Sequence, residues 1–105
     1  MDELIEILKA TGIPFAYDHF AEGESPAPPF ICYLLPDTDN FAADGSVYFH
    51  INQVRIELYT DCKDPVQEKI VEKSLDDAGI FYERSETWIP SERLYEVLFE
   101  FEMEA

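Results

Sequence analysis

A strict two-residue alternation near the C-terminal end constrains the fold of this chain more than any other feature. Between residues 95 and 104, aromatic or aliphatic side chains occupy every second position. The apolar set is Tyr95, Val97, Phe99, Phe101 and Met103, and the intervening set is Glu96, Leu98, Glu100, Glu102 and Glu104. Because successive side chains of a β-strand point to opposite faces, the pattern predicts a strand with one face in the core and a largely acidic face outside it.

A second segment, residues 54–61, shows the same period. Val54, Ile56 and Leu58 fall on one face of the expected strand. Arg55, Glu57 and Tyr59 fall on the other. The alternation predicts a second half-buried strand.

A helix is predicted directly after this second strand. Asp64 is placed to cap it, and Pro65 takes the first helical position, where its missing N–H costs nothing. The helix should continue to about Ala78 and end at Gly79. Its predicted core stripe is Val66, Ile70, Val71, Leu75 and Ala78, and its predicted solvent side is Glu68, Lys69, Glu72, Lys73 and Asp76.

The N-terminal half predicts another helix and shorter strands. Residues Asp2 to Ala10 form a helix with Leu4, Ile5 and Leu8 on one face, ended by Gly12 and Pro14. The segments that follow are a short strand over 15–20, an irregular proline-rich stretch over 22–29, an internal strand over 30–35 and a turn-rich loop over 37–46.

The remaining segments complete a sheet. Residues 47–59 predict one long strand, or two strands with a bend or bulge at 51–53, and residues 81–88 and 93–103 predict a hairpin with a tight connection at Trp88–Ser91. We therefore expect residues 1–105 to form a single α+β domain, a mainly antiparallel sheet with two helices packed on one face. The opposite face, where Tyr48, Tyr59 and Tyr82 are expected, should be solvated or covered by another subunit.

The charge of the chain excludes several classes of partner. Acidic residues outnumber basic ones 23 to 7, which gives a net charge of -16, while 47% hydrophobic residues indicate a folded domain. A surface so poor in Lys and Arg predicts no direct nucleic-acid or membrane binding. The simplest interpretation of the excess carboxylates is that they keep an apolar-rich domain soluble. Two more specific interpretations are that the protein mimics DNA or that it lines a channel through which DNA moves without adhering. No apolar run approaches a bilayer span and the first residues lack a basic signal region, so a cytoplasmic protein is expected.

No catalytic, cofactor or metal site is predicted, and we expect no enzyme. Asp37, Asp39 and Asp44 suggest a calcium loop, but its spacing would place Phe41 and Tyr48 at ligand positions. A packed or edge role is expected for His50, and His19 has no partner placed by the sequence for metal or base chemistry. Cys32 and Cys62 are expected to be free thiols that behave as small hydrophobes.

The order of these segments resembles a known family. The segments concerned are the helix Asp2–Ala10, the strand Val54–Asp61, the helix after Asp64-Pro65, and the ending Glu86–Pro90 with Leu94–Phe101. The chain is similar to the tail-completion and tail-terminator proteins of long-tailed bacteriophages and prophages. This resemblance implies an α+β subunit without an active site that forms a homo-oligomeric ring at the head-proximal end of a tail. Its partners would be tail-tube and head-completion proteins, and its location the host cytoplasm during assembly and then the virion.

Seven residues are candidates for the subunit interface or the lumen of such a ring. They are Asp37, Asp39, Phe41, Asp44, Tyr59, Glu100 and Glu102. The proline-rich segment Pro26–Pro29 and the strong acidity are departures that this resemblance does not account for. The alternative interpretation is an acidic DNA mimic that inhibits a nucleic-acid enzyme.

Overall fold

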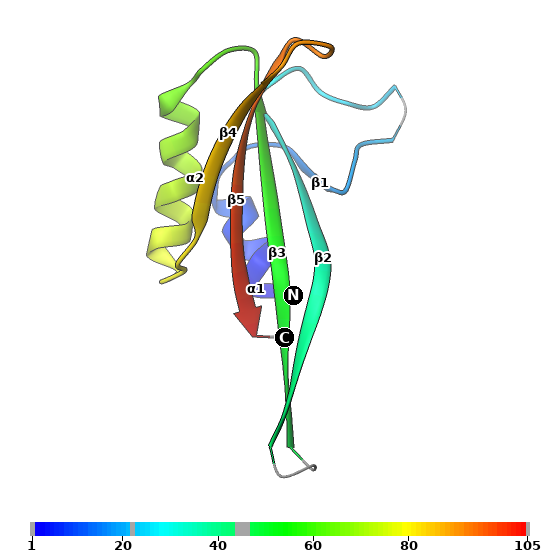
Figure 1. Cartoon of the computed structure of the whole chain (residues 1–105). Helices are drawn as coiled ribbons and strands as arrows, with labels where there is room; N and C mark the ends of the chain where they lie inside the picture. The colour runs from blue at the N-terminus through cyan, green and yellow to red at the C-terminus, as the bar shows by residue number, and fades with distance from the viewer. Residues whose placement is uncertain (1, 22, 44–46, 105) are drawn as a thin grey trace.

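A computed structural model describes residues 2–21, 23–43 and 47–104, with side chains described except at residues 2, 37–50 and 104. These residues form two helices and five strands, whose arrangement Figure 1 shows. In chain order they are α1 (Asp2–Ala10), β1 (Phe15–Tyr17), β2 (Phe30–Ala43), β3 (Val47–Thr60), α2 (Pro65–Asp77), β4 (Glu83–Ile89) and β5 (Leu94–Glu104).

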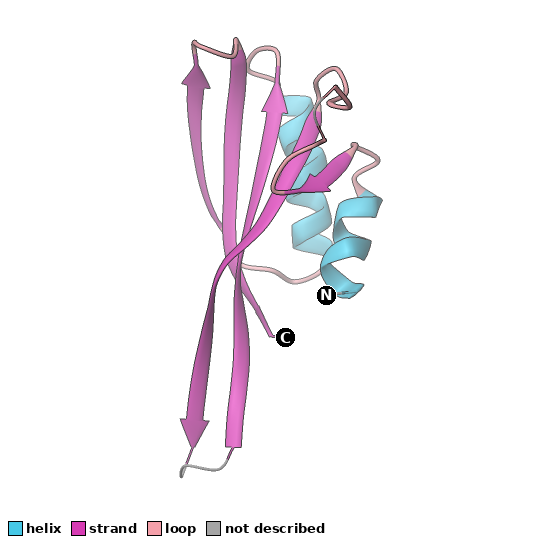
Figure 2. Cartoon of the chain, turned by 90° about the vertical axis from the view of Figure 1, so that its right-hand side faces the viewer, coloured by secondary structure: helices cyan, strands magenta, loops and turns pink. Residues whose placement is uncertain are grey.

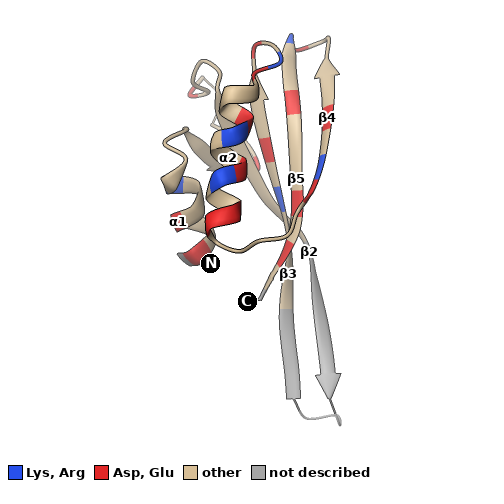
Figure 3. Cartoon of the chain, turned by 90° about the vertical axis from the view of Figure 1, so that its left-hand side faces the viewer, with Lys and Arg blue, Asp and Glu red and all other residues tan. Residues whose placement is uncertain are grey.

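The strands form one sheet in the order β1-β2-β3-β5-β4. The pairing of β1 with β2 is parallel, and the other three pairings are antiparallel. In Figure 2 the sheet lies in front of α2, whereas in Figure 3, from the opposite side, α2 lies in front of the sheet. The predicted α+β class, with a mainly antiparallel sheet and both helices on one face, is confirmed.

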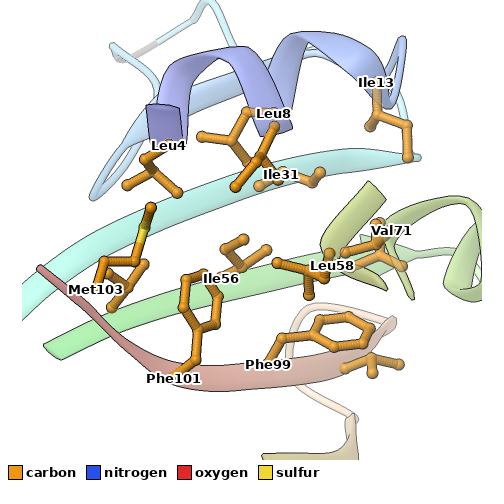
Figure 4. Packing of buried hydrophobic residues seen from close by; sticks show 14 residues of the cluster. Leu4, Leu8, Ile13, Ile31, Ile56, Leu58, Val71, Phe99, Phe101 and Met103 are labelled. Atoms are coloured by element: carbon orange, nitrogen blue, oxygen red, sulfur yellow. The ribbon is translucent and has the colours of Figure 1, made fainter. Parts of the chain in front are cut away.

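The core lies between the helices and this covered face of the sheet. Ile56 pairs with Phe99 and Leu58 with Val97 across β3 and β5, and all four side chains are fully buried. The helices close the core with Leu4, Leu8, Val71 and Leu75, as Figure 4 shows in part. The alternation of residues 95–103 is confirmed, because Val97, Phe99, Phe101 and Met103 are buried there while Glu100 and Glu102 are exposed.

Helix α2 begins and ends where the sequence predicts. Oδ1 of Asp64 accepts a hydrogen bond from the Gln67 N–H at 3.3 Å. At the other end Gly79 has a φ of 71°, a left-handed conformation that glycine adopts without strain, and the Ile80 N–H donates to the Leu75 carbonyl at 3.0 Å. These bonds satisfy backbone groups that a helix end would otherwise leave unpaired.

The predicted core stripe of α2 is partly wrong. Val66 is 67% exposed and Ala78 is also exposed, whereas Glu68, predicted on the solvent side, is only 3% exposed. The buried positions Glu68, Val71 and Leu75 follow i, i+3 and i+7 spacing, so they share one helix face. Val66 lies half a turn away from Leu75 around the helix axis.

The loop predicted over 37–46 is also wrong in part. Residues 37–43 belong to β2 and pair with 47–53 of β3, while 44–46 lie outside the described residues. The β5 strand ends its pairing at Ile51, so the farther part of β2 and β3 projects beyond the sheet as a two-stranded arm (Figures 1 and 2). Backbone pairing with a strand rich in β-formers overrides the turn propensity of Asp and Asn.

The sequence predicts a bend or bulge at residues 51–53 of β3. The irregularity instead lies in β2, between Leu34 and Asp37. Leu34 pairs with Arg55 and Asp37 pairs with Gln53, so two β2 residues oppose one β3 residue. One of the two is Pro36, which has no N–H to donate to the ladder, and a bulge accommodates such a residue.

The predicted C-terminal hairpin is confirmed, with shifted ends. Strand β4 starts at Glu83, and the pairing of Ile89 with Leu94 closes a connection over residues 90–93. Tyr82 was expected on the face away from the helices. Its ring instead lies 5.5 Å from that of Phe99, in the core on the helix side.

Candidate interaction surfaces

The sheet face turned away from both helices is the first candidate surface, and we call it the open face. Register between the strands places its side chains in cross-strand rows. One row is Phe30, Tyr59, Glu96 and Thr87; the next is Cys32, Glu57, Leu98 and Ser85; the third is Leu34, Arg55, Glu100 and Glu83, with Glu102 beyond it. The β2 side of the open face is therefore apolar, and the β5 and β4 side is acidic.

Tyr59 is at the centre of a polar cluster on the open face. Its hydroxyl lies 2.7 Å from Oε2 of Glu96 and 3.0 Å from Oε1 of Glu57. Oε2 of Glu57 lies 3.2 Å from Nε of Arg55, and the Glu57 side chain is only 14% exposed. Burial raises the pKa of Glu57, and the charge of Glu96 adds to this, although Tyr59 and Arg55 oppose it. Burial likewise raises the pKa of Tyr59, with a contribution from its bond to Glu96.

An aromatic group lies beside this cluster. The Phe30 ring stacks on Tyr59 at 5.2 Å, and Phe20 contacts Phe30 edge-on at 5.6 Å. A pocket of about 340 Å³ lies between the loop after β1 and the β4–β5 connection, and Cys32 is among its lining residues. Burial and the nearby Glu57 charge raise the pKa of Cys32 to about 11, so this thiol is protonated at neutral pH and is a poor nucleophile.

Three of the seven candidate residues lie together on the open face. Glu100 and Glu102 are exposed there with half-buried Tyr59. Glu100 pairs directly with Glu83, and Glu102 accepts a hydrogen bond from Nε2 of Gln53 at 3.0 Å. The other candidates are Asp37, Asp39 and Phe41, whose strand backbone is described but whose side chains are not, and Asp44, which lies outside the described residues. Their proposed role stays a prediction.

The histidine and cysteine predictions have mixed outcomes. His19 is 77% exposed, with Nδ1 3.0 Å from Oδ2 of Asp18, and the His50 side chain lies outside the described residues. Cys32 and Cys62 are both free. Cys32 is buried as expected, but Cys62 is exposed, because it lies in the connection between β3 and α2.

The sequence did not predict a second polar cluster, which joins α2 to β4. The Glu68 carboxylate contacts Arg84 and lies 2.8 Å from Nζ of Lys63. Glu86 contacts the same two cations, each at 2.8 Å, and accepts a hydrogen bond from the Tyr95 hydroxyl. The bond from Lys63, followed by that from Tyr95, lowers the pKa of Glu86 to about 2. The i, i+3, i+7 relation of Glu68 to Val71 and Leu75 is the sequence signal that could have revealed it.

The ion pairs among Lys63, Glu68, Arg84 and Glu86 hold α2 against the edge strand β4, and we call this cluster the α2–β4 clamp. Both cations bind the Oε1 atom of Glu68, and its Oε2 atom is buried without a hydrogen-bond partner. In the described ranges no three His, Cys, Asp or Glu side chains are arranged to hold a metal ion. No helix within those ranges is long and apolar enough to cross a bilayer.

The outward side of α2 is the second candidate surface. It carries Val66, Lys69, Lys73, Asp76 and Asp77, which we call the α2 outer stripe. Nζ of Lys73 lies 2.9 Å from Oδ2 of Asp77, and both side chains are highly exposed, whereas Lys69 makes no ion pair with any described residue. Figure 3 shows α2, with both basic and acidic bands along it, in front of the sheet and therefore on the side of the subunit opposite the open face.

The fold is found in a virion. The chain superimposes on a protein chain in the solved structure of the virion of a native gene transfer agent (GTA) particle, with a TM-score of 0.60. The match covers 98% of this chain and 88% of the other at 14% sequence identity, so it is a likeness of fold. No protein-family model matches the sequence, and no curated protein matches it.

Proposed function

We propose that this protein is a structural subunit of a phage-like particle, of the tail-completion or tail-terminator kind. The observation that carries the proposal is the shared fold with a virion chain over 98% of this chain. The order of elements that resembles the tail-completion and tail-terminator proteins supports the narrower role. In that role, copies of the subunit form a ring at the head-proximal end of a tail and contact tail-tube and head-completion proteins.

The surfaces of the subunit suit ring formation. A ring requires heterologous contacts, in which one surface of a subunit meets a different surface of its neighbour. The open face and the α2 outer stripe are two such surfaces, different in composition and on opposite sides of the subunit. The β2–β3 arm supplies a further projection that can contact a component above or below the ring.

The net charge of -16 suits a channel through which DNA passes. Carboxylates repel phosphates, so an acidic lumen keeps DNA from adhering to the wall. Glu100 and Glu102 remain the described candidates for such a wall. The DNA-mimic alternative draws on the same charge, but it has less support, because Glu57, Glu68 and Glu86 are occupied by contacts within the subunit.

The test combines assembly in solution with location in a particle. We expect light scattering during size-exclusion chromatography to give a mass that rises with concentration to a closed oligomer, and electron microscopy to show annular particles. Antibody labelling of particles that carry the protein should mark the joint between head and tail. A monomer at every concentration, together with no label on purified particles, would refute the proposal.

A further inference from the structure

The polar cluster around Tyr59 contains more short oxygen–oxygen contacts than Tyr59 has protons to donate. Oη of Tyr59 lies 2.7 Å from Oε2 of Glu96 and 3.0 Å from Oε1 of Glu57. Both distances are those of hydrogen bonds between oxygens, and each such bond requires a proton between its two atoms. A phenol hydroxyl donates one proton, and an ionised carboxylate only accepts. If both glutamates were ionised, one contact would therefore bring lone pairs together.

The two distances indicate where the hydroxyl proton of Tyr59 points. A bond from a hydroxyl to an ionised carboxylate is short, at about 2.5–2.7 Å, because the charge strengthens it. The contact with Glu96 has this length, whereas the contact with Glu57 is longer. An O–H group directed between both carboxylates would bend and weaken both bonds. The Tyr59 proton is therefore assigned to Glu96, and the contact with Glu57 needs a proton of its own.

Glu57 is placed to supply that proton. Its side chain is 14% exposed, and burial penalises an ionised carboxyl group more than a neutral one. Its two oxygens face different groups: Oε1 faces Tyr59, and Oε2 lies 3.2 Å from Nε of Arg55. That nitrogen makes no hydrogen bond within the described residues, so its hold on an ionised Glu57 is weak. A proton on Oε1 completes the contact with Tyr59 and leaves Oε2 facing the guanidinium.

Charged and titratable groups from four parts of the fold surround Glu57, and most of the charges favour a bound proton. The negative charges of Glu96 on β5 and Asp18 after β1 raise the pKa of Glu57, in addition to burial. Asp18 itself lies 3.0 Å from His19. The cross-strand neighbour on β2 is Cys32, whose thiol is neutral, and on β3 Arg55 opposes the proton. Tyr59 opposes it only when its own proton points to Glu57.

We propose that this cluster is a proton-binding site, in which the protonated Glu57 carboxyl donates to Oη of Tyr59 and the Tyr59 hydroxyl donates to the Glu96 carboxylate. With the proton bound, the chain of hydrogen bonds is complete and holds Tyr59 beside Phe30. Without it, Glu57 loses its bond to Tyr59 and the open face carries one more negative charge. The charge of the open face therefore depends on pH. The proposal concerns the single subunit and does not depend on the ring.

The test is a pH titration of the glutamate carboxyl carbons by ¹³C NMR, with the Glu57 resonance assigned by its absence in E57Q. The decisive variant is Y59F, which keeps the ring that stacks on Phe30 but removes the hydroxyl. If protonated Glu57 donates to Tyr59, the variant removes its acceptor, and the titration midpoint of Glu57 should move to lower pH. If Tyr59 instead donates to Glu57, the variant removes a donor to the ionised form, and the midpoint should move to higher pH.

Two controls separate a hydrogen bond from general effects. Y95F removes another hydroxyl that donates to a glutamate, Glu86, and should leave the Glu57 midpoint unchanged. The difference between Y59F and the native protein should persist between about 0.1 M and about 1 M NaCl, where the Debye length falls from about 10 Å to about 3 Å. A difference that disappears at high salt would reflect distant charges and would overturn the proposal.

The outcomes are distinct. A lower Glu57 midpoint in Y59F, with none in Y95F, supports the proton-binding site. A higher midpoint, an unchanged one, or an equal shift in both variants overturns it. The native protein provides a measurement that needs no variant, because the Tyr59 Cζ resonance should shift with the same midpoint as Glu57. A Cζ resonance that stays constant through that midpoint would also overturn the site, and none of these results bears on assembly into a ring.

Discussion

Replacing Glu68 tests whether the buried charge in the α2–β4 clamp stabilises the fold. The Glu68 side chain is 4% exposed, whereas those of Arg84 and Lys63 are 31% and 44% exposed. The cations can therefore be solvated without Glu68, but Glu68 cannot be solvated without unfolding. Desolvation of a buried carboxylate costs several kcal/mol, and only good pairing offsets it.

Two substitutions of Glu68 separate the contribution of its charge to stability from the contribution of its shape. Glu68→Met keeps the volume, completes an apolar stripe with Val71 and Leu75, and leaves both cations near Glu86. We expect its free energy of unfolding to lie within about 1 kcal/mol of the native value, or above it. Glu68→Gln keeps the shape but presents an uncharged amide to two cations, and should cost about 1–3 kcal/mol. These expected losses in the free energy of unfolding are smaller than the loss for a fully buried ion pair, because Arg84 is partly solvated.

Urea unfolding followed by circular dichroism and by the fluorescence of Trp88, the single tryptophan, measures both values. The control is Glu72→Gln, because Glu72 lies 3.7 Å from Nε of Arg84 and is partly exposed, so we expect a change below about 0.5 kcal/mol. A loss of more than about 3 kcal/mol in Glu68→Met, as large as the loss expected when one partner of a buried ion pair is removed, would refute the reasoning.

Three further predictions concern titration. The pKa of Glu86 is lowered to about 2, so its ionised form stabilises the fold fully above the unfolded pKa near 4.5, and this contribution is lost as the pH falls toward 2. In the Glu86→Gln variant, the urea midpoint should therefore depend less on pH over that range. The pKa of Glu57 is raised by burial, so its ionised form destabilises the fold at neutral pH, and Glu57→Gln should raise the urea midpoint at pH 7 but not at pH 3. A thiol reagent at pH 8 should modify exposed Cys62 rapidly and Cys32, with its pKa near 11, only upon unfolding; equal rates would contradict its burial.

The periodic parts of the fold were predictable because each carries its own signal. Strand β5 follows a period of two, and α2 begins at a capping Asp64 and a proline and ends at Gly79. The predicted stripe of α2 failed because it joined Val66 to Leu75, positions half a turn apart. Which arc of a helix is buried depends on the strands that it covers, and Glu68 is buried because β4 brings Arg84 to it.

The arm and the open face were harder to predict for a different reason. Residues 37–43 carry turn-forming side chains, and only pairing with residues 47–53, which are adjacent in space, makes them a strand. The candidates Tyr59, Glu100 and Glu102 meet on one face because β3 pairs with β5, across an intervening helix and strand. The alternation within one strand determines which face of the sheet each side chain lies on, but it does not determine which strand pairs with that strand.

The two edges of the sheet differ in how they oppose the addition of another strand. Strand β4 forms one edge, and six of its seven residues are exposed, with Glu83, Arg84 and Glu86 among them. Charged side chains on an edge strand oppose the addition of another strand. At the other edge, β1 pairs only with Ile31, Cys32 and Tyr33 of β2. The open face carries Glu83, Glu96, Glu100 and Glu102, and these carboxylates oppose contact with an identical face. The two sides of the sheet differ, because the helices cover only one of them, and the proposed ring of identical copies requires two different surfaces that can meet.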